Sequence, residues 1–116
     1  MNRVDIRKSV ALLLIGYGVS IRTRGFRLCI QSVERMLFDA DNSTKALSKS
    51  AKYAGIDIKS AYKYVLCNAL KVGKRLQRKF TPGELLQFLA ENVAERAIKD
   101  DWHHNSDTFY SLGSNF

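Results

Sequence analysis

Five side chains between Lys59 and Cys67 have the types and the spacing needed to read the edges of DNA base pairs. They are Lys59, Ser60, Lys63, Tyr64 and Cys67. Steps of three and four residues place such side chains on one face of a helix. Ammonium and hydroxyl groups can donate hydrogen bonds to base edges in the major groove. The sequence therefore predicts a helix over 58–74 whose first part, 58–68, contacts bases.

A second set of cations surrounds this face and is suited to phosphates rather than bases. Between Lys45 and Lys79 there are ten Lys or Arg residues and one acid, Asp57. Contacts to phosphates set the register of a protein on a duplex without reading sequence. The cations predicted for this role are Lys45, Lys49, Lys52, Lys71, Lys74, Arg75 and Arg78. A solvated basic surface is the alternative interpretation of the same charge.

Length and composition favour one globular, helical domain. The chain has 116 residues, 46% of them apolar, with a net charge of +8 and a single proline. Such a chain can bury one core, and we expect a core over about 4–99 followed by a tail, 100–116. Cys29 and Cys67 lack the paired spacing of a disulfide framework or a zinc motif. Reduced thiols in the cytoplasm are the simplest interpretation.

Apolar periodicity predicts an all-α fold, a compact bundle of about five to six helices that contains a helix-turn-helix. We expect helices over about 4–17, 26–39, 44–54, 58–74 and 82–99. In the helix over 58–74, the spacing assigns these residues to the buried face: Ile58, Ala61, Tyr62, Val65, Leu66, Ala69, Leu70, Val72 and Gly73. Asn68 is then expected on the outer face.

Capping residues mark where the helices begin. Ser43 or Thr44 is expected to cap the first helix of the helix-turn-helix, and Asp57 the second. Gly55 suits the left-handed turn between them, and Ala51 with Gly55 would permit a close helix crossing. Before the last helix, residues 81–84 read Thr-Pro-Gly-Glu, the pattern of a capping box.

The chain beyond residue 99 is rich in aromatic residues, which indicates packing against the bundle or against a partner. These residues are Trp102, Phe109, Tyr110 and Phe116. His103 and His104 are adjacent and would point in different directions, so we expect no metal site. From Glu84 onward there are six acids and two cations, so this part of the chain should face away from phosphates.

Enzyme and membrane classes find little support. The sequence has no glycine-rich phosphate loop, nucleophile elbow or HExxH motif, so we expect neither catalysis nor a cofactor. Arg7, Lys8 and the uncharged run 9–20 resemble a signal peptide. However, three arginines follow at once, and the run is too short to span a bilayer.

Several landmarks in order resemble the C-terminal DNA-binding effector domain of the sporulation response regulators (stage zero sporulation protein A). They are Gly18-Val19, Gly25-Phe26, Ser60, Ala69-Leu70-Lys71-Val72, Thr81-Pro82 and Glu84-Leu85-Leu86-Gln87-Phe88-Leu89-Ala90. The resemblance covers about 10–99. It implies an all-helical domain of about six helices that binds duplex promoter DNA.

The departures from that family limit what the resemblance implies. The family has arginines where this chain has Ala61, Tyr64 and Cys67, and a glutamate where it has Lys63, so base preference does not carry over. No receiver domain precedes the helices, so we expect no control by phosphorylation within the chain. The expected function is a sequence-specific transcriptional regulator that binds double-stranded DNA, with a homodimer on DNA as a further expectation. The alternative is a protein-interaction module that binds RNA polymerase or a full-length homologue.

Overall fold

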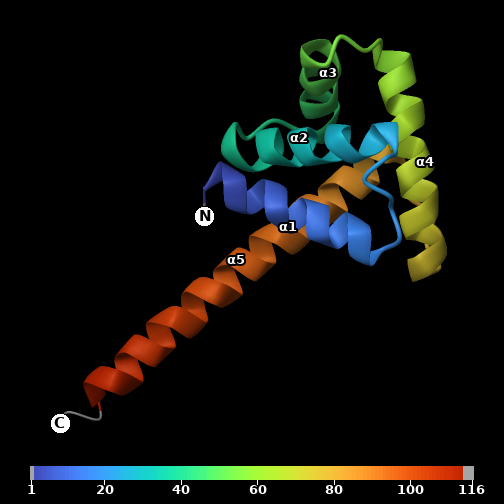
Figure 1. The fold of residues 1–116 in the computed structure, drawn as a ribbon. Helices are drawn as coiled ribbons and strands as arrows, with labels where there is room; N and C mark the ends of the chain where they lie inside the picture. Colours follow the sequence, from blue (N-terminus) through green and yellow to red (C-terminus); the bar gives the residue numbers. More distant parts are fainter. Residues whose placement is uncertain (1, 114–116) are drawn as a thin grey trace.

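The protein folds into five helices and no strands over the residues that the structure describes. The structure is a computed structural model that describes the backbone of residues 2–113 and the side chains of residues 2–99. The helices are α1 (Arg3–Gly16), α2 (Arg24–Phe38), α3 (Ser43–Tyr53), α4 (Ile58–Leu76) and α5 (Pro82–Gly113) (Figure 1). The predicted all-α bundle is confirmed, with five helices.

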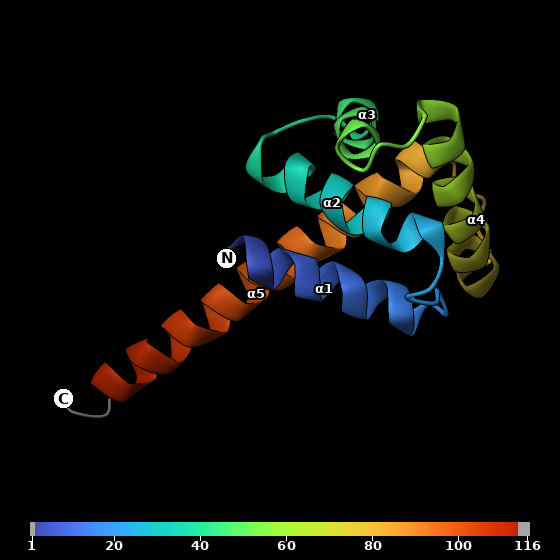
Figure 2. The ribbon, with the colours of Figure 1, turned by 45° about the horizontal axis from the view of Figure 1, so that its top comes forward.

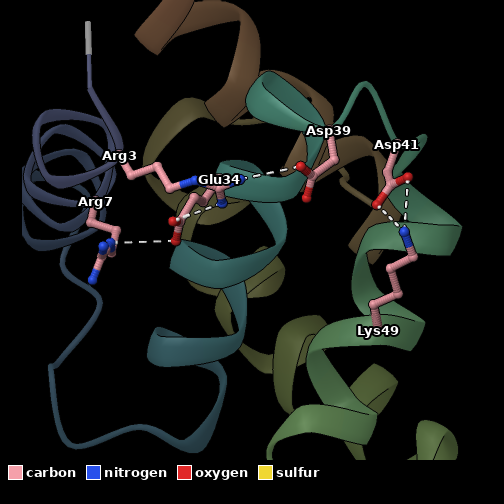
Figure 3. A network of polar contacts seen from close by, with 6 residues as sticks. All are labelled: Arg3, Arg7, Glu34, Asp39, Asp41 and Lys49. Atoms are coloured by element: carbon pink, nitrogen blue, oxygen red, sulfur yellow. Dashed lines mark hydrogen bonds and ion pairs between the residues drawn. The ribbon is translucent and has the colours of Figure 1, made fainter.

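Helix α2 is the centre of the fold, because all four other helices pack against it (Figure 1). Fully buried side chains fill the space around it, among them Leu14, Leu28, Val65 and Leu89. Ion pairs hold α1 against the C-terminal end of α2. The Arg3 guanidinium lies 3.2 Å from the Glu34 carboxylate and 3.2 Å from the Asp39 carboxylate (Figure 3).

Helix starts agree with their capping signals at two positions and differ at one. The Asp57 carboxylate accepts from the Ser60 amide at the start of α4. Thr81 and Glu84 form the predicted capping box, with both hydrogen bonds at 3.1 Å. The bond from the Thr81 backbone lowers the pKa of Glu84 below its usual 4.5. The cap predicted at Ser43 or Thr44 was wrong, because Asn42 accepts from the Lys45 amide at 2.8 Å.

Glycine allows the close helix crossing at a different place from the one predicted. Gly55 has a φ of +68°, so the left-handed turn between α3 and α4 is confirmed. A Cβ added there would meet nothing within 4 Å, so the expected close crossing at Gly55 was wrong. At Gly25 of α2, an added Cβ would lie 2.4 Å from the carbonyl oxygen of Tyr64 in α4. The close approach is therefore between α2 and α4.

Helix α5 continues beyond its predicted end near residue 99 as far as Gly113. Its C-terminal part runs away from the other four helices (Figures 1 and 2). The side chains of Trp102, His103, His104, Phe109 and Tyr110 lie outside the described side chains, and Phe116 lies outside the described backbone. Among the described residues, no helix combines the length and the apolar character needed to cross a membrane.

Candidate nucleic-acid interface

Helix α4 lies along one edge of the bundle (Figure 1), and it exposes a line of mostly basic side chains. Its buried face packs on α2, α3 and α5 and consists of Ala61, Val65, Asn68, Ala69, Val72 and Gly73. On the opposite side, steps of four, four and seven residues bring Lys59, Lys63, Cys67 and Lys74 into one line, and all four are exposed. We call these four residues the outer line. Three of the five predicted base-reading residues lie in it.

Tyr64 and Asn68 do not lie on the exposed face where the sequence placed them. Asn68 is only 1% exposed, and its amide donates to the Cys29 thiol of α2 at 3.9 Å. Tyr64 is half-buried, and its hydroxyl accepts a 2.7 Å hydrogen bond from Arg24, whose guanidinium also stacks 5.3 Å from the ring centre. Both predictions of exposure were wrong because α2 packs on this side of α4.

Ser60 is the fifth predicted base-reading residue, and it lies beside the outer line rather than in it. The residue is half-buried in the first turn of α4. Its backbone amide is engaged with the Asp57 carboxylate, which completes the helix cap. Contact between Ser60 and a base stays a prediction.

Three residues predicted to be buried are instead exposed on α4. Ile58 is 45% exposed, Tyr62 is 47% exposed and Leu70 is 62% exposed. These residues, with the half-buried Leu66, recur every four positions and so form a row of their own beside the outer line. That regular spacing was the sequence signal for a separate apolar row, and the prediction that all these residues share one buried face was wrong for Ile58, Tyr62 and Leu70.

Two of the predicted phosphate contacts are already paired with an acid. Lys49 of α3 contacts the Asp41 carboxylate at 3.0 Å (Figure 3), and Lys45 contacts it at 3.7 Å. The Asp41 side chain is nearly buried, and the hydrogen bond from Lys49 lowers its pKa below the usual 3.8. Since both lysines serve to neutralise Asp41, they are poorer candidates for phosphate binding than an unpaired cation.

Among the predicted phosphate contacts, Arg78 lies against an aromatic ring of the fold. Its guanidinium lies 4.6 Å from the ring centre of Phe80. Lys71, Lys74 and Arg75 instead surround an open hollow of about 500 Å³ together with Tyr17 and Gly18. Lys52 is exposed in the last turn of α3. Within the part of the chain whose side chains are described, these four cations form no ion pair.

No protein-family model matches the chain, and no curated protein or solved structure does either. The resemblance to sporulation effector domains therefore stays a prediction from sequence landmarks. Among the side chains of residues 2–99, no three His, Cys, Asp or Glu residues gather as metal ligands would. The chemistry of the candidate site is that of exposed cations, one thiol and an apolar row.

The two cysteines provide a chemical probe of this surface. Cys67 is exposed in the outer line, whereas Cys29 is fully buried and its burial raises the pKa of its thiol to about 12. Because the thiolate is the nucleophile, we expect iodoacetamide to modify Cys67 in the folded protein and to spare Cys29.

Mass spectrometry of peptides would measure the modification at each cysteine separately. If duplex DNA covers the outer line, adding a duplex should slow the alkylation of Cys67 in proportion to the bound fraction. Cys67→Ser should remove the reaction, and denaturant should expose both thiols of the unchanged chain. Rapid alkylation of native Cys29 would contradict the packing of α2 against α4.

Proposed function

We propose that this chain binds duplex DNA in a sequence-specific manner, with α3 and α4 acting as a helix-turn-helix and α4 lying in the major groove. The observation that carries the proposal is the outer line, in which an exposed helix face presents Lys59, Lys63 and Lys74 without an acid. The α3–α4 pair supports it further, since a left-handed Gly55 and a capped second helix are features of helix-turn-helix units.

The positions of the cations along α4 suit two kinds of contact. A recognition helix contacts base edges with its N-terminal residues, and Lys59 and Lys63 lie in the first two turns. Lys71 and Lys74 follow after 12 and 15 residues, or roughly 18 and 22 Å at about 1.5 Å per residue. The major groove is about 12 Å wide. With Lys59 inside the groove, the later lysines would therefore lie near the phosphates that border it.

A role as a transcriptional regulator in the cytoplasm follows from the same proposal together with the resemblance to sporulation effector domains. A second candidate is a protein-interaction module, which exposed apolar side chains on α1 favour. Leu12 is 65% exposed and Ile15 is 50% exposed, on the opposite side of α1 from its buried residues. A gel shift on a pool of random duplexes separates the two candidates, because only the first requires that DNA be bound.

Alanine variants of two lysines should distinguish base reading from phosphate anchoring. We expect Lys63→Ala to weaken the preferred duplex by roughly 1–3 kcal/mol, because a lysine can donate to guanine O6 and N7. Binding to scrambled duplexes should change much less. Lys74→Ala should weaken binding to all duplexes about equally. It should also make the log–log slope of affinity against salt shallower by about one. The preferred duplex is the one recovered by selection from a random pool.

Lys8→Ala is the matched control, because Lys8 is an exposed cation on α1 away from the proposed interface. It removes the same charge and should leave both affinities nearly unchanged. If Lys63→Ala and Lys74→Ala both reduced affinity uniformly, with no change in preference between specific and scrambled duplexes, Lys63 would not read a base. Binding would then rest on phosphate contacts alone.

A further inference from the structure

Two exposed apolar side chains, Ile58 and Tyr62, lie in the first two turns of α4, where a recognition helix meets base edges. Together with Lys59 and Lys63 they line an open hollow of about 390 Å³ whose wall is almost entirely carbon. Since this wall is almost entirely carbon, the two lysines contribute their aliphatic stems to it. A hydrogen-bonding surface alone would not need such an apolar patch.

The major groove offers one apolar feature, the C5-methyl group of thymine. A patch bordered by two cations also matches the charge of a duplex, since phosphates border the groove in which the methyl groups lie. Asp57 caps this end of α4, and its carboxylate is engaged with the Ser60 amide at 3.3 Å. Charge and polarity at the hollow therefore both fit a thymine-bearing stretch of duplex DNA.

We propose that Ile58 and Tyr62 form a contact surface for thymine methyl groups, so that the chain prefers duplexes with thymine at the positions that meet the first two turns of α4. This inference rests on the proposed function, because it names a base that the proposed DNA-binding face of α4 would select. Burial of one methyl group is worth about fourfold in affinity. Two contacted thymines would therefore favour a site by roughly 15-fold over the same site without the methyl groups.

Replacing thymine by uracil tests the methyl contact directly, because uracil keeps every hydrogen-bonding group and lacks only the methyl. Duplexes selected from a random pool would be amplified with either dTTP or dUTP and compared by gel shift at one salt concentration. We expect the uracil duplexes to bind at least about fourfold more weakly. Tyr62→Ser should weaken binding to the thymine duplexes and lower the thymine-to-uracil ratio, and the double variant Ile58→Ser, Tyr62→Ser should bring that ratio close to one.

Tyr53→Ser is the matched control, because Tyr53 is 77% exposed at the end of α3 and its loss removes the same ring. Its thymine-to-uracil ratio should equal that of the unchanged protein. Equal binding of thymine and uracil duplexes by the unchanged protein would overturn the methyl contact and leave duplex binding intact. An unchanged ratio in Tyr62→Ser would overturn the assignment of Tyr62.

Two further results bear on the proposed function itself. If the folded protein bound no duplex at all, the proposed function would fail, and with it this inference. If it bound the single strands of the selected pool more tightly than the duplex, the tyrosine would serve to stack on unpaired bases. That result would also overturn the methyl contact.

Discussion

Gly25→Ala is expected to lower the free energy of unfolding by about 3 kcal/mol, the upper part of the usual range for an overpacked core. A Cβ at this position would lie 2.4 Å from the carbonyl oxygen of Tyr64 and 2.3 Å from the amide nitrogen of Asn68. The first neighbour is helix backbone, so rotation of a side chain cannot relieve the clash. Helices α2 and α4 would have to separate, and thermal unfolding should shift by roughly 10–15 °C.

Gly16→Ala is the matched control for this effect. Gly16 is the last residue of α1, and an added Cβ would meet nothing within 4 Å. Since alanine favours helix over glycine by about 0.5–1 kcal/mol, this variant should be as stable as the unchanged protein or slightly more stable. If circular dichroism melts showed the same midpoint for Gly25→Ala and the unchanged protein, the close approach of α2 to α4 would be incorrect.

Local signals in the sequence predicted where most helices begin and turn. Asp57, Gly55 and the capping box at Thr81 act through hydrogen bonds or backbone angles within three or four residues, so they can be read without the tertiary structure. The cap of α3 was misplaced by one or two residues, because Asn42, Ser43 and Thr44 can all cap a helix. The end of α5 carried no signal at residue 99, because the next glycine is Gly113.

The orientation of α4 could not be predicted from its periodicity. Apolar residues lie on much of the helix surface, so the row that contains Ala61 and Val65 and the row that contains Ile58 and Tyr62 both have helical spacing. Which row is buried depends on the neighbouring helix, and α2 approaches closely because Gly25 lacks a side chain.

This approach buries the polar Asn68 and leaves Tyr62 exposed. The Asn68 side-chain nitrogen donates to the Cys29 thiol, whereas its buried side-chain oxygen has no hydrogen-bond partner among the described residues. A contact between residues 39 positions apart leaves no mark in a local pattern. The contacts of Asp41 with Lys45 and Lys49, and of Arg78 with Phe80, join residues at most eight positions apart, and the prediction from charge alone did not include them.

The salt dependence of DNA binding should reflect which cations the fold leaves unpaired. Lys52, Lys71, Lys74 and Arg75 remain as candidate phosphate contacts, and four such contacts at about 0.9 each would give a log–log slope of roughly −4. Affinity should then fall roughly 150-fold between about 50 and 200 mM salt. The set of seven cations expected from the sequence would give a slope of roughly −6. Filter binding or fluorescence anisotropy over this range would separate the two slopes.

Asp41→Asn should steepen the slope, because it removes the charge that pairs with Lys49 (Figure 3) and with Lys45 in α3. If both released lysines reach phosphates, the slope would change by up to about −2. Asp39→Asn is the matched control: it also removes an acid between α2 and α3, but Asp39 pairs with Arg3 of α1. Its slope should stay at roughly −4 once the small change in net charge is taken into account.

A slope near −6 in the unchanged protein, with no response to Asp41→Asn, would mean that the Asp41 pairs open on DNA and that all seven cations contact phosphates. A slope near zero would remove phosphate contacts from the proposal altogether.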